Sequence, residues 1–564
     1  MKVIVSTLLS MVPISRRRNY ILLFRYFVFL IFMIALYSVL FHVLMLLEDQ
    51  YYSWITGVYW TLTTMSTLGF GDITFESDIG RIFSVVVLLS GIVLLLVMLP
   101  FTFIQFFYAP WLEAQIKSRA PRELPEDTSG HVLLTSFDAT SVQLVDKLRK
   151  YGYPYVILFE DIQAALRAND EGYRVAVGEF TDPETFRKLQ VNKAALLFAS
   201  VDDMINTSIA FTARGISKTV PIFANAERDD SVDILELAGC THVFQFMKML
   251  GQSLARRTMG SSTRANVIGN VETILIAEAA VMRTPLQGKT LGETRLRETI
   301  GVSVIGLWEQ GKFILPTAET MLGSSSVLVL AGSPEQLTEY DHKYGQYQQS
   351  DTPVLILGGG RVGRAAAEAL RERGIEYRII EKSPKLIRDK HRYIQGNASD
   401  INTLKRAGID AAPTIIITTH DDATNIFLTI YCRRLRPDIQ IICRAEIDRS
   451  VSILHSAGAD LVMSHASIST NTILNLLNPN ELLMLSEGLN VVSLEVPPAL
   501  VGNSIAKSSI RMHTGCSVIG IKDGKNTHLN PDPTIVLNQG NELIIICTDE
   551  SHKQFLRRYP VKNR

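Results

Sequence analysis

Two glycine patterns in this chain have the spacing to bind ions of opposite charge. The first is T-L-G-F-G-D at residues 67–72, and the second is G-x-G-x-x-G, formed by Gly358, Gly360 and Gly363. Glycine adopts backbone angles that are closed to other residues, so alternating glycines can turn successive carbonyls toward a cation. The same freedom lets a backbone approach a phosphate, which the N–H groups at a helix start attract. We therefore expect a cation site at the first pattern and an anion site at the second.

Two long apolar segments flank the first pattern. Residues 21–47 carry one charge, Arg25, and residues 82–111 carry none of Asp, Glu, Lys or Arg. Each segment exceeds the roughly 20 residues that a helix needs to cross a bilayer. Basic residues cluster outside the two spans, at 16–18 and 117–122, which places both chain ends in the cytoplasm. We predict a multi-pass protein of the cell inner (plasma) membrane.

The segment between the spans is aromatic and rich in threonine over residues 51–66. It is too short to span, and we expect a re-entrant helix over about 54–64, because such backbone is tolerated only inside protein or a water-filled cavity. The carbonyl end of this helix favours a cation. An extended run over 67–71 would aim its carbonyls at one axis, with Leu68 and Phe70 pointing away. One chain supplies one row of oxygens, so four chains are needed to replace the hydration shell of K⁺.

The run T-T-M-S-T-L-G-F-G-D resembles the potassium-channel signature, usually T-V-G-Y-G-D. With its two spans and no Arg-rich membrane helix, the layout resembles the two-transmembrane prokaryotic channels. In this family Phe70 stands where a tyrosine usually tethers the filter to the pore helix, and Leu68 replaces a valine. The resemblance implies K⁺ as the permeant ion and a selectivity filter of Thr67, Leu68, Gly69, Phe70, Gly71 and Asp72.

The second span carries one glycine and one proline that could shape a gate. Gly91 is either a hinge or a site of close helix packing, which is common in membranes. A proline inside a helix removes a hydrogen bond, so we expect a kink at Pro100. Leu95, Leu96 and Leu99 are candidates for a hydrophobic constriction near the cytoplasmic end.

The remaining two thirds of the chain contain an internal repeat. Residues 222–243 match residues 441–462 without a gap, and residues 285–312 match residues 499–525 after a one-residue adjustment. Short apolar runs alternate with helical patterns, which predicts parallel doubly wound sheets. We therefore expect two copies of a unit with an α/β first half and a smaller β-rich second half.

This tandem arrangement resembles the RCK (KTN/TrkA-type) regulatory unit of potassium channels and transporters. The fold class expected is an α-helical two-transmembrane pore domain plus cytoplasmic α/β, with Rossmann-like RCK-N units each followed by an RCK-C subdomain. The family implies a homotetramer with a gating ring of eight RCK units. The predicted segments are 1–20 (N-terminal interfacial), 21–112 (pore domain), 113–130 (linker), 131–260 (first RCK-N), 261–345 (first RCK-C), 352–480 (second RCK-N) and 481–564 (second RCK-C).

The second glycine pattern has the context of a nucleotide site. It follows the apolar strand 354–357, opens a helix, and is followed eighteen residues after Gly363 by Glu381. An acid at this place accepts hydrogen bonds from ribose hydroxyls and repels a 2′-phosphate, so we expect NAD rather than NADP. ADP and ATP carry the same ribose and remain alternatives. Further candidate contacts are Arg361, Val362, Lys382, Asn397, His420 and Arg444.

The first unit lacks this pattern. Thr135, Phe137 and Thr140 stand where the glycines are expected, although Glu160 follows the second strand. Side chains at those positions would obstruct a pyrophosphate, so we expect no dinucleotide in the first unit.

Three other functions are alternatives. A Ca²⁺-regulated channel could use acids between RCK units, or the cluster Asp229, Asp230, Asp233 and Glu236, which also reads as a solvated helix face. A membrane-anchored NAD oxidoreductase would leave the first pattern unexplained, and no catalytic constellation is recognisable, so we predict no enzyme. A transporter-associated regulatory subunit usually lacks its own pore. Zero net charge gives no sign of nucleic-acid binding, and five cysteines without C-x-x-C spacing indicate a reducing compartment.

Overall fold

In the computed structural model the chain forms two compact units, with the boundary between Pro121 and Arg122. The N-terminal end of the predicted interfacial segment (residues 1–13) and part of the predicted linker (113–120) lie outside the described residues. The structure describes residues 14–109, 111–112, 121–258, 265–271, 274–282, 284–309, 312–323, 326–344, 352–477, 482–484, 489–524, 526–529 and 531–560.

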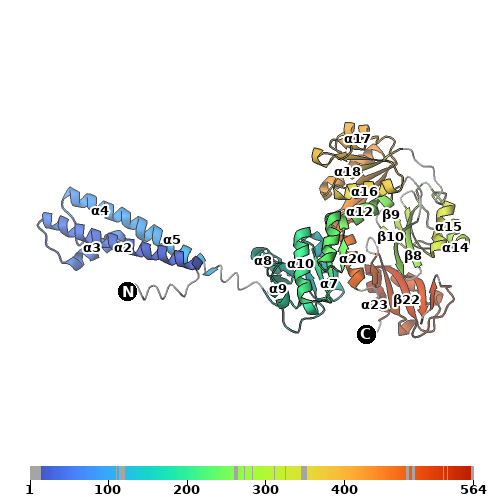
Figure 1. Ribbon diagram of the computed structural model, residues 1–564, viewed down its shortest axis with the longest axis horizontal. Helices are drawn as coiled ribbons and strands as arrows, with labels where there is room; N and C mark the ends of the chain where they lie inside the picture. The colour runs from blue at the N-terminus through green and yellow to red at the C-terminus, as the bar shows by residue number, and fades with distance from the viewer. Residues whose placement is uncertain are drawn as a thin grey trace. The chain divides into compact units, whose positions relative to one another are not determined.

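The first unit is helical. Two helices, over Leu23–Leu47 and Asp78–Phe106, are long and apolar enough to cross a membrane, and Figure 1 shows them side by side. A shorter helix lies between them in the chain and starts where the sequence predicts it, with Ser53 as N-cap. Its Trp60 packs with Phe41 and Phe75 in an aromatic core shared by all three. The elements are α2 (Ile14–Leu47), α3 (Trp54–Met65), α4 (Asp78–Gly91), η1 (Ile92–Met98), α5 (Leu99–Phe103) and η2 (Ile104–Tyr108).

The second unit begins with a six-stranded parallel sheet of order β3-β2-β1-β4-β5-β6. This is the doubly wound order, in which ligands bind where the strand order reverses, beside the first strand. The strands are β1 (Val132–Leu134), β2 (Tyr155–Phe159), β3 (Val175–Val177), β4 (Leu196–Ala199), β5 (Ile222–Asn225) and β6 (His242–Phe244). The helices are α7 (Ala139–Lys150), α8 (Ile162–Asp170), α9 (Pro183–Lys188), α10 (Asp203–Ile216), α11 (Val232–Leu237) and α12 (Phe246–Arg256).

The second α/β half repeats this topology, with the parallel order β14-β13-β12-β15-β16-β17. Strands β12, β15, β16 and β17 are buried along their whole length, as expected for a sheet covered on both faces, whereas the edge strand β14 is only partly buried. The strands are β12 (Val354–Leu357), β13 (Tyr377–Glu381), β14 (Tyr393–Gln395), β15 (Thr414–Ile417), β16 (Gln440–Ala445) and β17 (Leu461–Ser464). The helices are α16 (Arg361–Glu372), α17 (Ile401–Ala407), α18 (Asp422–Leu435), α19 (Arg449–Ser456) and α20 (His465–Leu477).

Each α/β half is followed by a small antiparallel sheet, which confirms the predicted tandem fold class. The first has the order β10-β9-β11-β8-β7, with β7 (Asn266–Val271), β8 (Ile274–Ala280), β9 (Ser303–Glu309), β10 (Lys312–Ile314), β11 (Ser326–Gly332) and helices α13 (Leu291–Thr294), α14 (Leu296–Thr299) and α15 (Pro334–Tyr344). The second has the order β18-β19-β22-β20-β21, with β18 (Leu482–Met484), β19 (Leu489–Glu495), β20 (Ser517–Asp523), β21 (Asn526–Leu529), β22 (Glu542–Thr548) and helices α21 (Ile505–Ser508), α22 (Ile510–Thr514) and α23 (Asp549–Arg558).

The two α/β halves exchange their last helices. Helix α12 leaves the first sheet and packs on α16 of the second, where a Cβ at Gly251 would lie 2.6 Å from Ala365 Cβ. Helix α20 in turn packs on α7, and Lys147 Nζ donates to Asn471 Oδ1 at 2.5 Å. The last helix of each half therefore packs on the first helix of the other half. Helix α16, which starts within the glycine pattern, is in direct contact with the first half through α12.

Candidate functional site

The end of α3 organises the first glycine pattern. The main-chain N–H groups of Leu68 and Gly69 both donate to the carbonyl of Thr63, at 2.9 and 3.1 Å, and Thr67 N–H donates to Thr64 O at 3.1 Å. These bonds satisfy carbonyls that a helix end leaves open. They also fix where the extended run starts relative to α3.

The backbone of the pattern alternates in handedness. Thr67, Gly69 and Gly71 have φ of 62°, 47° and 75°, while the residues between them do not have positive φ. A Cβ at either glycine would meet nothing within 4 Å, so the left-handed angle and not space requires glycine there. Such alternation aims successive carbonyls to the same side, as the sequence argument requires.

Tyr59 supports this segment and was not predicted. Its hydroxyl donates to Asp72 Oδ2 at 3.1 Å, and its ring lies parallel to the Phe70 ring with 6.4 Å between centroids. Trp60 Nε1 donates to Ile73 O at 3.2 Å, just beyond the pattern. The α3 helix therefore holds the segment through Asp72 although position 70 has no hydroxyl. The aromatic pair Tyr59–Trp60 in the sequence was the available signal.

The second glycine pattern forms a tight turn between β12 and α16. Gly358 has φ of 108°, and a Cβ at Gly363 would collide with the Gly358 carbonyl. Gly360 is the N-cap of α16 and has no side chain to cap it, so the first N–H groups of this helix receive no N-cap side-chain bond. This geometry presents backbone donors at a helix N-terminus, where anions bind.

Glu381 lies at the end of β13, next to the turn. It is 9% exposed, and its two oxygens accept hydrogen bonds from the N–H groups of Gly359 (2.6 Å) and Ser383 (2.7 Å). A carboxylate oxygen has two lone pairs, so each oxygen can accept a further bond from a ribose hydroxyl. Strands β12 and β13 are neighbours, which brings Gly358 and Glu381 together as the sequence predicts.

The other side chains that the sequence predicts as nucleotide contacts do not gather at the glycine turn as Glu381 does. Arg444, at the end of β16, is buried and pairs with Glu446, which also lies 3.6 Å from His465. Lys382 and His420 are exposed. Asn397 is exposed as well, and its Oδ1 accepts the Ser399 N–H at 3.1 Å in the turn after β14.

Three residues near the turn were not predicted. Thr418 Oγ1 donates to Gly358 O at 2.9 Å, and Arg364 donates to Gly359 O at 2.9 Å. Burial and the nearby Arg388 lower the pKa of Arg364. The Tyr393 ring lies beside Gly359, where a Cβ would come within 3.1 Å of it. Arg364 directly follows Gly363 in α16, whereas Thr418 follows β15 and Tyr393 lies on β14, so the fold brings these two side chains to the turn from distant parts of the chain.

Arg361 connects the turn to the first α/β half. Its guanidinium lies 2.6 Å from the carboxylate of Glu227, which follows β5. The pair is about half exposed and is therefore a weak contribution to stability. Its position matters more, because Arg361 is the first residue of α16.

The first α/β half differs at every equivalent position, and the structure corrects the sequence alignment by one residue. Tyr155 pairs with Val132 as Tyr377 pairs with Val354, and the N-caps of α7 and α16 are Asp138 and Gly360. The positions that match the three glycines are therefore Ser136, Asp138 and Ser141, rather than Thr135, Phe137 and Thr140.

The acid at the end of the second strand is also displaced in the first half. Phe159, and not Glu160, ends β2 where Glu381 ends β13, and its ring packs against Phe137 with 5.7 Å between centroids. Glu160 instead accepts the Phe180 N–H at 3.0 Å. At the helix start, Asp138 accepts the Ser141 N–H at 2.8 Å. A carboxylate and two aromatic rings thus fill the first turn.

One acid of the cluster considered for a metal, Asp229, is engaged in other contacts. Asp229 accepts from Lys248 Nζ and Gln245 Nε2, both at 2.8 Å, and these bonds lower the pKa of Asp229. Within the described ranges, no three His, Cys, Asp or Glu side chains are grouped so as to hold a metal ion.

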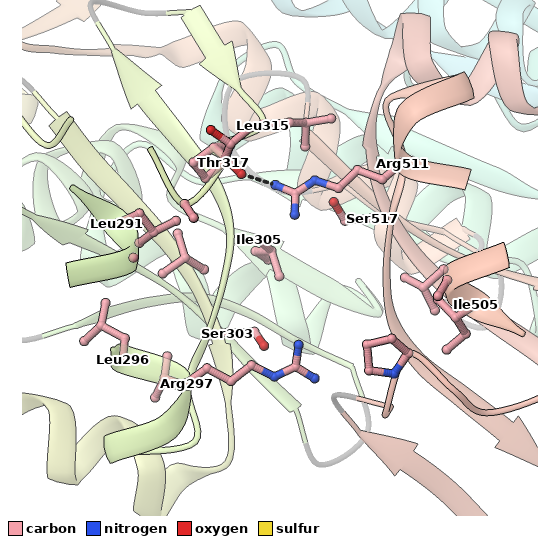
Figure 2. A pocket seen from close by; sticks show the side chains of 18 of the residues that line it. Leu291, Leu296, Arg297, Ser303, Ile305, Leu315, Thr317, Ile505, Arg511 and Ser517 are labelled. Atoms are coloured by element: carbon pink, nitrogen blue, oxygen red, sulfur yellow. Dashed lines mark hydrogen bonds between the residues drawn. The ribbon is translucent and has the colours of Figure 1, made fainter. Parts of the chain in front are cut away.

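A cavity of about 870 Å³ lies between the two small β subdomains, away from the glycine turn. Figure 2 shows Arg297 and Ser303 on one side and Arg511 and Ser517 on the other, with Arg511 donating to Pro316 O at 2.8 Å. None of the predicted nucleotide contacts lines it.

The fold, with two apolar helices followed by tandem α/β units, defines a membrane channel with RCK-type regulatory domains. The Ion channel family profile matches residues 26–108, the TrkA-N domain profile matches 132–246 and 354–465, and the TrkA-C domain profile matches 276–343 and 491–559. The chain belongs to the family of two-transmembrane prokaryotic potassium channels with tandem RCK domains.

Individual relatives agree with this assignment. The solved structure of the GsuK channel bound to NAD is 37% identical, with a TM-score of 0.59, and the match covers 96% of this chain and 99% of that one. A structure of the GsuK channel is 38% identical with the same TM-score and coverage. Potassium channel protein 1 of Methanocaldococcus jannaschii is 29% identical over 219 residues, which are 36% of this chain and 66% of that protein. The chain thus spans just under two thirds of the length of that relative.

Proposed function

We propose that this protein is a K⁺-selective channel of the cell inner (plasma) membrane, gated from the cytoplasm by an adenine nucleotide at the second α/β half. NAD is the first candidate, because a similar protein, the GsuK channel, was solved with NAD bound. ADP and ATP present the same adenosine ribose and phosphates to Gly358–Gly363 and Glu381. Both chain ends lie in the cytoplasm in this arrangement.

The filter proposal is supported by the alternating backbone of Thr67–Gly71. Four copies of this segment around one axis would surround K⁺ with rings of carbonyl oxygens. Leu68 and Phe70 are about two thirds exposed in the single chain, so a neighbouring copy is needed to cover them.

The nucleotide proposal rests on one observation above all. The N-terminus of α16 has no side-chain cap, whereas Asp138 caps the equivalent helix α7 in the same chain. A helix normally satisfies its first N–H groups with a side chain, water or a ligand. The second half leaves these donors available beside a buried acid, and the first half fills the same place with its own side chains.

A ring of eight RCK units is supported by two exposed apolar helix faces. Met204 and Phe211 on α10 and Leu237 on α11 are 78%, 73% and 87% exposed. The second half exposes Phe427 and Ile430 on the equivalent helix α18. Patches of this kind on a soluble domain mark protein interfaces, and a repeat that carries the patch twice can close a ring.

Ligand binding would reach the pore through the packed helices. Helix α16 receives the phosphates, touches α12 through Gly251 and touches the first half through Arg361 and Glu227. Residues 113–130 connect the second membrane helix to the start of the first half. In that helix the gate would involve Gly91, Leu95, Leu96, Leu99 and Pro100. The ligand can shift gating only by its differential affinity for the open and closed rings.

Single-channel recording in bilayers tests both parts. We expect K⁺ to be preferred over Na⁺, and open probability to change when NAD, ADP or ATP is added to the cytoplasmic side, with Ca²⁺ as a separate addition. Gly360→Asp places a negative charge at the helix start and should abolish the nucleotide response while leaving a K⁺-selective pore. Gln163→Glu adds the same charge to the first half and should respond as wild type. Equal K⁺ and Na⁺ permeability contradicts the filter, and a full response in Gly360→Asp contradicts the site.

A further inference from the structure

The second membrane helix departs from α-helical geometry in its middle. Residues Ile92–Met98 form π-helical turns between α4 and α5. The sequence explains why: in an α-helix the Leu96 carbonyl would face position 100, but Pro100 has no N–H. A π-helical turn pairs a carbonyl with the N–H five residues on, and for Leu96 this is Phe101. The wider turn also relieves the clash of the proline ring with that carbonyl.

One side chain of the other membrane helix reaches into this segment. The hydroxyl of Tyr26, on α2, donates to the main-chain carbonyl of Leu94 at 2.5 Å. Leu94 is 8% exposed and belongs to the core that joins the helices, and Tyr26 packs against the same core. A side chain bonded to a helix carbonyl from outside is a recognised cause of altered helix geometry. In a bilayer no water competes for the carbonyl.

In a helix that lines a pore, a π-helical segment determines which side chains beyond it face the pore. Successive residues of an α-helix are rotated by about 100° around its axis, because a turn holds 3.6 residues. A π-helical turn accommodates one more residue, so its conversion to α-helix rotates everything beyond it by about that angle. The helix over Leu99–Phe103 would then turn a different set of side chains toward the axis of the pore.

We propose that Tyr26 is a positioning residue of the pore, and that its bond to Leu94 holds the π-helical form and so the rotation of the helix beyond it. This inference rests on the proposed function, because it takes the second membrane helix to line the K⁺ pathway. It adds that the outer helix α2 sets the face that the gate region presents.

The test measures which side chains of residues 99–103 are accessible from the pore. Leu99, Phe101, Thr102 and Phe103 are replaced by cysteine one at a time, and block of K⁺ current by a cytoplasmic thiol reagent gives a modification rate at each position. Each cysteine is examined with Tyr26 and with Tyr26→Phe. We expect the ratio of rates between adjacent positions to change about three- to eighteenfold, which is the population shift that corresponds to about 0.6–1.7 kcal/mol, the average and the maximum for a side-chain hydrogen bond between membrane helices. Lost stability alone would lower expression and leave the ratios unchanged.

Tyr37→Phe is the matched control. Tyr37 lies on the same helix, is buried, and packs edge-on against Phe83 at 6.0 Å, so the substitution removes a buried hydroxyl and leaves the Tyr26–Leu94 bond in place. It should leave the ratios at their wild-type values. Ratios within twofold of wild type in Tyr26→Phe overturn the proposal, as does an equal change in Tyr37→Phe.

A second variant covers the case in which Tyr26→Phe does not assemble. Pro100→Ala restores the N–H that Leu96 lacks in an α-helix, and should shift the ratios in the direction expected for loss of the π-helical form. Unchanged ratios in Pro100→Ala overturn the proposal. If no cysteine position responds in the Tyr26 background, the helix does not line the pathway and the proposed function fails instead.

Discussion

Gly91 of the second membrane helix lies directly against the backbone of Met65, the last residue of α3. A Cβ at Gly91 would collide with the Met65 Cα and carbonyl oxygen and would come within 2.7 Å of its carbonyl carbon. Met65 itself is fully buried. Because the proposed filter segment starts two residues later, this contact links the second membrane helix to the start of that segment.

Gly91→Ala should therefore disrupt the pore domain. The obstacle is backbone and not a flexible side chain, so the added methyl group forces the helices apart, at a cost of about 1–3 kcal/mol. We expect a lower melting temperature of the detergent-solubilised assembly and a weaker preference for K⁺ over Na⁺. Ser90→Ala, one position earlier, should change neither. If Gly91→Ala assembles normally, keeps its selectivity and alters only open probability, a hinge describes Gly91 better than close packing.

Tyr59→Phe should weaken the support of the filter. The substitution keeps the ring beside Phe70 and removes the donor to Asp72, whose bond is worth about 1 kcal/mol in a partly solvated place. We expect lower K⁺/Na⁺ selectivity or faster current decay during sustained opening. Tyr51→Phe, at an exposed tyrosine before α3, is the control. Wild-type selectivity and decay in Tyr59→Phe would show that the Asp72 bond does not support the filter.

Glu381→Gln should reduce nucleotide affinity about tenfold. The amide keeps the size of the side chain, but one of its two oxygens becomes a nitrogen that cannot accept the bonds from Gly359, Ser383 or a ribose hydroxyl. Loss of one such bond to a charged group corresponds to about 1.5 kcal/mol. Calorimetric titration of the purified protein with NAD measures the change, and titration with NADP tests whether discrimination against the 2′-phosphate falls. Glu160→Gln, in the first half, should bind as wild type does.

The exposed apolar side chains of α10, α11 and α18 allow a test of the proposed ring of RCK units. Leu237→Asp places a charge at a side chain that is 87% exposed in the single chain, so it should leave the fold of that chain intact. If the face is an interface, the charge must be desolvated there, and we expect the assembly to dissociate into smaller species in light scattering. Glu236→Gln on the same helix is the control. An unchanged mass for Leu237→Asp would remove this face from the interface.

Sequence patterns correctly predicted those features of the fold that depend on residues close together in the chain. The helix of residues 54–64, the left-handed backbone at Gly69 and Gly71, and the glycine turn beside Glu381 follow from periodicity, turn residues and spacing. The exchange of α12 and α20, the Arg361–Glu227 pair and the approach of Tyr26 to Leu94 join residues far apart in the chain, and no spacing rule reveals them. The one-residue shift in the first half shows the same limit. Without glycines to mark the turn, only strand pairing and the N-cap Asp138 fix the alignment.

The loop that precedes α4 is bonded to a carboxylate whose hydrogen bonds should depend on pH. Glu48, just after α2, accepts hydrogen bonds from Ser77 Oγ and from the N–H groups of Glu76 and Ser77, the last two at 3.0 Å. These bonds, with Ser77 first, lower the pKa of Glu48 from its ordinary 4.5. A lowered pKa means that the folded loop favours the carboxylate, so this stabilisation is complete above about pH 4.5 and is lost as the pH falls through the lowered value.

We therefore expect acidification below about pH 4.5 to loosen the attachment of the loop before α4. Hydrogen exchange of the Glu76 and Ser77 amides, followed by mass spectrometry after correction for the pH dependence of the chemical exchange rate, measures this directly. Glu48→Gln should show reduced protection already at neutral pH and no further step on acidification. Glu76→Gln leaves the Glu48 carboxylate in place and should keep the wild-type profile. Protection that is independent of pH in the wild type, or a preserved acid step in Glu48→Gln, would mean that another group holds this loop.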